Sequence, residues 1–333
     1  MKKVTIRDVA RAAGVSVATV SRAINGSDAV TPETQQRILE VIRTTGYQIP
    51  GGGKKTSAED GLLYFIMKRA STNVYSALLN RQMILEAGKK GLTVVSANIE
   101  TTVNRSSEEI LKNLRMASQL DVRGVVISGF AEEAPSQEVQ QYLRECGLPL
   151  VFINRTMSKY SYNRVLTGSE RGAYQAVTHL LENGRRHLMM LTLPNHNGKT
   201  QGFEHAVKEY EGNDLHSQVC VTTDDSYESC VQALTDALEQ DPDLDGILCC
   251  ADELAACLLQ KLTQLGKRVP EEIELIGYND NLAPLLNPPL SSIHVPLEQI
   301  AASAVEMILD EKLHRPGASA KTVLMDPQLI LRG

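Results

Sequence analysis

The chain has 333 residues, of which 42% are hydrophobic and 22% charged, a composition normal for a globular protein of two or three domains. It contains no apolar run long enough for a membrane helix and no apolar signal region at its N-terminus, so we expect a cytoplasmic protein. The net charge of −6 argues against a protein that coats nucleic acid with its whole surface.

Positive charge is concentrated near the N-terminus. Residues 1–55 contain nine Lys and Arg and four Asp and Glu, which gives a net charge of +5. Because the whole chain has a net charge of −6, the rest of the chain carries −11. A basic segment is attracted to phosphates, whereas an acidic one is repelled by them. We therefore expect DNA to bind at one end of this chain only.

The cysteines and histidines show no metal-binding spacing. No C-x-x-C or H-E-x-x-H motif occurs, so no metal and no other cofactor is predicted. Most cysteines lie in apolar segments, so free thiols in a reducing compartment are expected rather than disulfides. The six cysteines are Cys146, Cys220, Cys230, Cys249, Cys250 and Cys257.

The stretch from residue 4 to residue 25 predicts two short helices joined by a tight turn. Thr5 is a good N-cap, and apolar residues follow at helical spacing as far as Ala13. Gly14 can end the first helix in a left-handed conformation, and Ser16 can cap the second helix, from Val17 to Ile24. This arrangement is typical of a DNA-binding helix-turn-helix, although an ordinary helical hairpin has the same spacing.

A third helix and a linker complete the N-terminal region. Thr31 is suited to cap a helix that has Pro32 at its first position and an apolar face that includes Ile38 and Val41. Residues 51–57, GGGKKTS, read as a flexible polar linker. The sequence thus predicts an all-α DNA-binding domain over 1–50, a Gly-rich linker over 51–60, and a further domain over 61–333.

From residue 61 onward, short apolar strands alternate with helices. Such alternation predicts an α/β body of parallel sheets with helices on both faces, and no dinucleotide or P-loop motif accompanies it. The expected strands are 62–67, 92–97, 124–127, 150–153, 187–193, 246–249, 273–278 and 323–325. The expected helices are 74–90, 107–120, 137–146, 172–183, 202–210, 227–239, 253–265 and 297–311.

The sequence of the N-terminal stretch closely resembles the headpiece of the lactose/galactose repressor (LacI–GalR) family; it reads TIRDVARAAGVSVATVSRAIN. The body resembles the same family, most clearly in GAYQAVTHLLENGRRHLMML, RVPEEIELIGYND and PPLSSI. The resemblance implies a periplasmic-binding-protein-like body of two parallel-sheet subdomains linked by three crossings. We expect one subdomain over about 61–160 plus 292–318, and the other over about 161–291 plus 319–333.

The resemblance also implies residues that contact DNA. Base edges are expected to meet Val17, Ala18 and Arg22, although Val17 and Ala18 could instead only pack the turn. An Arg paired with guanine discriminates by about 1–3 kcal/mol. Phosphates are expected to be contacted by Thr5, Ser16, Thr19, Ser21, Asn25, Thr31 and Thr34. Each of these phosphate-contacting residues could instead only cap a helix or face solvent. A homodimer on an inverted repeat is implied, with the helix at 75–90 in the dimer face.

The resemblance further implies a small effector between the subdomains. The positions that match the family's pocket are Asn73, Tyr75, Asn154, Arg155, Lys199, Asp252 and Asn279. Several of the family's carboxylate, amide and aromatic positions are replaced, which would leave hydroxyls of an ordinary sugar unpaired. Either the ligand is a sugar acid or sugar phosphate, favoured by Arg155, Lys199 and His196, or effector control is weak or absent. Asn73, Tyr75 and Asp252 could also be structural.

The linker departs from the family, whose hinge helix inserts a Leu into the minor groove. Here Ile49-Pro50 is followed by three glycines and no Leu stands in the wedge position. We therefore expect that the operator is not kinked, or that it is bound more weakly.

The sequence as a whole predicts a DNA-binding repressor of a carbohydrate-utilisation operon, modulated by a sugar, sugar acid or sugar phosphate. The alternatives are a regulator with little or no effector response and a solute-binding protein without a regulatory role. An enzyme is not expected, because no nucleophile elbow, catalytic carboxylate pair or metal spacing is present.

Overall fold

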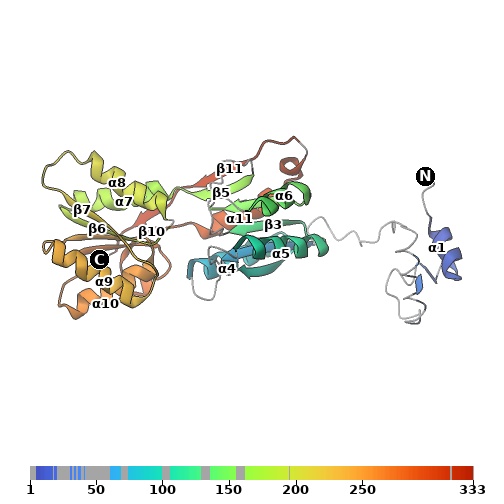
Figure 1. The fold of residues 1–333 in the computed structure, drawn as a ribbon, viewed down its shortest axis with the longest axis horizontal. Helices are drawn as coiled ribbons and strands as arrows, with labels where there is room; N and C mark the ends of the chain where they lie inside the picture. The colour runs from blue at the N-terminus through green and yellow to red at the C-terminus, as the bar shows by residue number, and fades with distance from the viewer. Residues whose placement is uncertain are drawn as a thin grey trace. The chain divides into compact units, whose positions relative to one another are not determined.

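The structure of the chain is a computed structural model that divides into two compact units, residues 1–60 and residues 61–333 (Figure 1). In the first unit it describes residues 5–17, 19–20, 31, 34, 37–38 and 41. In the second unit it describes residues 61–68, 74–99, 106–128, 136–154, 162–194, 196–315 and 317–332. Among these residues no helix is both long enough and apolar enough to cross a membrane.

The first unit contains the predicted helical head. Helix α1 (Ile6–Ala13) ends at Gly14, whose φ of 64° is left-handed, as predicted. The described residues of the second and third predicted helices are helical as well. A small closed core holds these segments together, formed by Val9, Ala10, Ala13, Val20 and Ile38.

The second unit begins with a six-stranded parallel sheet of order β11-β5-β4-β3-β1-β2. Its strands are β1 (Gly61–Lys68), β2 (Leu92–Ile99), β3 (Gly124–Ser128), β4 (Leu150–Ile153), β5 (Asn163–Thr167) and β11 (Thr322–Met325). Its helices are α4 (Val74–Lys89), α5 (Ser106–Gln119), α6 (Gln137–Glu145) and α11 (Leu297–Leu309). Alternate residues of β1 face opposite layers, so Leu63 packs with α4 whereas Tyr64 packs with α5.

The second sheet also has six strands, in the order β12-β10-β9-β8-β6-β7. Its strands are β6 (His187–Thr192), β7 (His216–Val221), β8 (Gly246–Cys249), β9 (Glu274–Asn279), β10 (Ser291–His294) and β12 (Gln328–Ile330), of which β12 alone is antiparallel to its neighbour. Helices α7 (Ser169–Glu182) and α8 (Asn197–Glu209) cover one face, and α9 (Tyr227–Gln240) and α10 (Asp252–Gln264) cover the other (Figure 1). The predicted α/β body of two largely parallel sheets is therefore present.

The chain passes three times between the two sheets, but each crossing comes later than predicted. It passes from β5 to α7 near residue 168, from β10 to α11 near 295, and from β11 to β12 near 326. Residues 292–294 thus belong to the second sheet, and residues 322–325 to the first. The predicted subdomain boundaries at 160, 291 and 318 are corrected accordingly, because β5 and β10 were not recognised as strands that precede the first two crossings.

Candidate DNA-reading head and effector site

Hydroxyl side chains close the ends of the helices in the head. Thr5 donates through its backbone N and its Oγ1 to Asp8 Oδ2, at 2.9 and 2.6 Å. Ser16 Oγ accepts from the Thr19 backbone N at 3.1 Å. Five of the hydroxyl residues expected at phosphates therefore lie in pairs at helix starts: Thr5 pairs with Asp8, Ser16 with Thr19, and Thr31 Oγ1 donates to the hydroxyl of Thr34 at 2.9 Å.

The second helix of the head presents an apolar side chain to solvent at its start. Val17 is 41% exposed, although its neighbour Val20 is fully buried in the core. Val17 is not part of the core that the described residues of the head form, and it fits contact with a base edge such as a thymine methyl group. The other residues expected at bases or phosphates, Ala18, Ser21, Arg22 and Asn25, lie outside the described residues, as do the linker glycines.

The residues expected at the effector lie where strands of the two sheets end. Asn154 directly follows β4, and its Nδ2 donates to Tyr75 Oη at 2.7 Å. Its Oδ1 accepts from both the backbone N and the Oγ1 of Thr167, at 3.0 Å each. Asn154 thus joins α4, β4 and β5, and burial raises the pKa of the Tyr75 hydroxyl. Asn73 and Arg155 lie outside the described residues.

Lys199, near the start of α8, is buried, with only 8% of its surface exposed. Its Nζ donates to the Cys250 carbonyl oxygen at 2.6 Å and lies 3.7 Å from the centroid of the Tyr278 ring. Burial lowers the pKa of this ammonium to about 8, against weaker opposing effects of nearby acidic groups. The cation predicted to attract an anion is therefore desolvated and already has partners.

Asp252, at the first position of α10, is completely buried. Its Oδ2 accepts from the backbone N of residues 281, 282 and 283, at 2.7, 3.0 and 3.1 Å. Its Oδ1 accepts from Ser292 Oγ at 2.7 Å. These four bonds occupy the carboxylate, so Asp252 orders the loop after β9, which is the structural role weighed for it, and it has no capacity left for an effector.

The backbone is unusual at the ends of two strands. Asn154, Asn279 and Asp280 have positive φ angles of 54°, 96° and 57°. Non-glycine residues adopt such angles rarely, at a cost of about 1–3 kcal/mol each, and they gather at binding sites. Asp280 is fixed by an ion pair with Arg332 at 2.6 Å, which leaves the half-exposed Asn279 as the accessible side chain of this turn.

Three further residues at this edge were not predicted from the sequence: Glu253, Tyr278 and Asn281. The Tyr278 hydroxyl donates to the Ser169 carbonyl oxygen at 3.2 Å. Both carboxylate oxygens of Glu253 and both amide atoms of Asn281 are shielded from solvent without a hydrogen-bond partner among the described residues. The only sequence signal was their position after the C-terminal ends of β8 and β9.

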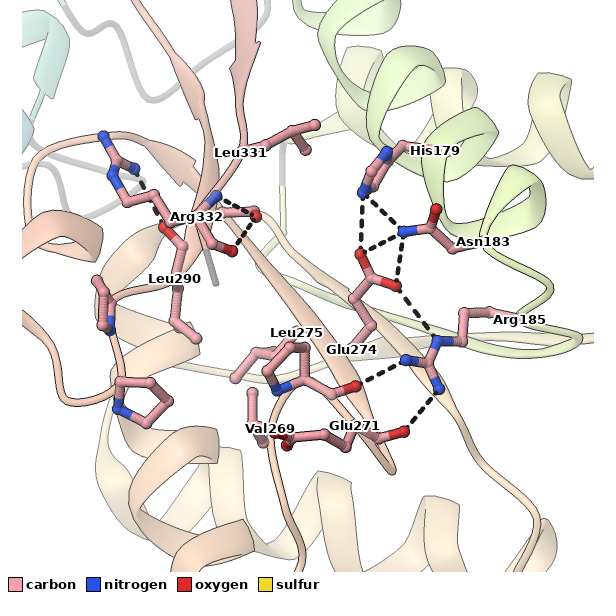
Figure 2. A pocket seen from close by; sticks show the side chains of 14 residues that line it. His179, Asn183, Arg185, Val269, Glu271, Glu274, Leu275, Leu290, Leu331 and Arg332 are labelled. Atoms are coloured by element: carbon pink, nitrogen blue, oxygen red, sulfur yellow. Dashed lines mark hydrogen bonds and ion pairs between the residues drawn. The ribbon is translucent and has the colours of Figure 1, made fainter.

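A cavity of about 510 Å³ lies at the opposite edge of the second sheet, where β9 and β10 begin (Figure 2). At its centre, Glu274 is bonded by His179 Nε2 at 3.0 Å, by Asn183 Nδ2 at 3.1 and 3.2 Å, and by Arg185 Nε at 3.2 Å. Arg185 also donates to the Pro270 carbonyl oxygen at 2.7 Å. Because these polar groups satisfy one another, the cluster fits a structural role better than a binding one.

One group of described residues could supply metal ligands. His187, Asp241 and Asp243 place ligand atoms within 4.8 Å of one another. His187 Nδ1 is however engaged with the Asp241 carboxylate at 2.8 Å, and Asp243 is exposed. The geometry is that of a part-buried histidine–aspartate pair, and we assign no metal to it.

Comparison with known proteins agrees with this architecture. Residues 5–49 match the family model of bacterial regulatory proteins of the lacI family, and residues 177–333 match the periplasmic binding protein-like domain. The HTH-type transcriptional repressor PurR of Photobacterium profundum is 27% identical, over 98% of this chain and 97% of its own. Catabolite control protein A of Priestia megaterium is 28% identical, over 92% and 91%.

A solved structure of the Lac repressor bound to ONPG has the same fold, with a TM-score of 0.70 at 20% identity, over 99% of this chain and 98% of that one. The helical head, the two-sheet body and these matches extend over nearly the whole chain. The chain therefore joins a DNA-binding domain of the lacI family of bacterial regulatory proteins to a periplasmic binding protein-like domain.

Proposed function

We propose that the protein is a transcriptional repressor of a carbohydrate-utilisation operon that binds an inverted-repeat operator as a homodimer. The exposure of Val17 beside a closed helical core is the observation that carries this proposal. A side chain placed in this way, at the start of the second helix, can enter the major groove while the caps hold the helix in register. As a DNA-binding regulator, it would act in the cytoplasm.

The homodimer is supported by the surface of α4. Ile84 and Leu85, consecutive residues of the helix that was expected in the dimer face, are 47% and 45% exposed. Adjacent large apolar side chains are costly to leave in water, so they favour association. A single head also reads too few base pairs to select one site in a genome.

A small effector is proposed to bind where the strands of the second sheet end. Lys199 and Asn279 remain candidate ligands there, and Tyr75 and Asn154 are candidates on the first sheet. The positive φ angles of Asn154 and Asn279 support this position.

The test is selection of bound sequences from a random DNA pool by the intact protein. The expected result is a pseudo-palindromic site whose genomic copies lie beside genes of carbohydrate metabolism. Enrichment of no sequence, with binding that depends on salt alone, would contradict the proposal.

A further inference from the structure

Three polar side chains gather at one edge of the second sheet. Lys199 follows β6, Glu253 follows β8 and Asn281 follows β9, and these three strands are neighbours in the sheet. The carboxyl ends of neighbouring parallel strands meet at one edge, where ligands bind in open α/β folds. The inference below rests on the proposed effector function of this edge.

Glu253 and Asn281 are unusual because their polar atoms are buried and unsatisfied. Both oxygens of Glu253, and both amide atoms of Asn281, lack a hydrogen-bond partner in the described part of the chain. Each such group costs about 1–3 kcal/mol, and native structures tolerate few of them. Two that lie together, on different elements, indicate a place prepared for a binding partner.

The charges nearby favour a positively charged partner. Burial raises the pKa of the Glu253 carboxyl, and repulsion by Asp252 adds to this rise, whereas the backbone of Glu253, the Asn281 side chain and Lys199 only partly oppose it. Lys199 forms no ion pair with Glu253 among the described residues, because its Nζ is held by the Cys250 carbonyl oxygen and the Tyr278 ring. Asp252 and Glu253 thus provide two carboxylates against one ammonium.

Asp280, a further acidic group at this edge, does not change this balance. Asp280 is neutralised by Arg332, whose Nη1 lies 2.6 Å from Asp280 Oδ1. An anionic ligand would bring a third charge of the same sign toward Asp252 and Glu253. This arrangement argues against the sugar acid or sugar phosphate that the sequence suggested.

We propose that Glu253 and Asn281 bind the amino group of a small polyhydroxylated amine, of the amino-sugar class. An ammonium has three N–H donors, which suits the Glu253 carboxylate and the Asn281 carbonyl oxygen together. The bond to Glu253 is charge-assisted and therefore stronger than one from a neutral hydroxyl. A neutral sugar would leave the buried charge of Glu253 uncompensated.

The test uses matched pairs of probes that differ in one group. Thermal unfolding and calorimetric titration of the intact protein would compare glucosamine with glucose, galactosamine with galactose, and mannosamine with mannose, and would include glucose 6-phosphate. We expect at least one amine to raise the melting temperature and to bind at least tenfold more tightly than its neutral counterpart. Equal binding of the amine and its neutral counterpart in all three pairs, preference for the phosphate, or no response to any amine would overturn the inference.

Variants distinguish the loss of a ligand contact from a loss of folding. Glu253→Gln keeps the size of the side chain and removes the charge, so it should lower the amine affinity at least tenfold, and Asn281→Ala should lower it as well. The control is Glu239→Gln, at an exposed position near the end of α9, which should change nothing. Because Glu253→Gln removes a buried charge, its melting temperature without ligand should be equal to or higher than that of the unaltered protein, which shows that the variant folds.

Operator binding, measured on the same samples, distinguishes two failures. If the protein selects a DNA sequence but no amine preference is seen, this inference fails and the proposed regulator stands. If no DNA sequence is selected, the proposed function itself fails.

Discussion

At the scale of single residues, the edge of the second sheet depends on a buried carboxylate that serves the backbone. Asp252 accepts three backbone N–H groups and one hydroxyl. Asp252→Ala would leave these four donors buried and unpaired, so we expect a loss of about 3 kcal/mol or more in the free energy of unfolding. Urea denaturation measures this loss. Asp252→Asn should cost less, and Asp243→Ala, at an exposed aspartate, should stay within about 0.5 kcal/mol.

The buried Lys199 should make the stability of the protein depend on pH. Its pKa is about 8 in the folded protein and near the ordinary 10.5 when unfolded, so the unfolded state binds more protons between these values. Stability therefore rises with pH in this window, by up to about 3 kcal/mol from this group. In Lys199→Met this gain is absent. Urea denaturation at pH 7, 8, 9 and 10 should show the free energy of unfolding rising more steeply with pH in the unaltered protein than in Lys199→Met. The control Lys208→Met, at an exposed lysine, should follow the unaltered protein. The same pH dependence in Lys199→Met and the unaltered protein would contradict the lowered pKa of Lys199.

Residue roles could be predicted from the sequence where the partner is near in the chain. The caps at Thr5 and Ser16 and the stop at Gly14 depend on residues within a few positions, and the structure confirms them. The partners of Lys199 and Asp252 lie 29 to 51 residues away, in β10 or in the segments that follow β8 and β9. Nothing local distinguishes a buried, satisfied aspartate from one that faces a ligand.

At the scale of elements, helices α7 and α8 pack so closely that only glycine fits at one point. A Cβ on Gly202 would overlap the carbonyl oxygen of Glu170, whereas a Cβ on Gly198 would lie 3.5 Å from its nearest neighbour, Ser169 Cβ. We expect Gly202→Ala to destabilise the protein by about 1–3 kcal/mol, as overpacking does. Gly198→Ala, in the same helix, should be neutral or stabilising by up to about 1 kcal/mol. Thermal unfolding of the two variants provides the comparison, and equal effects would contradict the close contact.

Most elements could be predicted because their apolar patterns are strong, whereas four short strands could not. β7 is an edge strand whose sequence, HSQVCV, has no fully buried side chain, and β12 has only three residues. β5 and β10 could not be predicted because they contain polar residues, such as Asn163 and Ser292, whose burial depends on the tertiary structure. Missing β5 and β10 displaced the predicted crossings between the sheets.

At the scale of the whole molecule, the proposed homodimer depends on the apolar surface of α4. Ile84→Asp would place a charge in the proposed interface and should shift the protein from dimer to monomer in sedimentation analysis. Leu120→Asp introduces the same charge at a leucine that is 40% exposed after α5, and should leave the dimer intact. A dimer that survives Ile84→Asp would place the interface elsewhere.

The central claim is that the head reads a DNA sequence through its second helix. The most direct measurement is a fluorescence-anisotropy titration of the selected inverted repeat, its half-site and a scrambled duplex at one salt concentration. We predict tight binding to the full repeat. Val17→Gln should lower the affinity for the full repeat at least tenfold and leave the affinity for the scrambled duplex unchanged. Val221→Gln, at another exposed valine, should have no effect. Equal affinity for the repeat and the scrambled duplex, or no effect of Val17→Gln, would contradict the account.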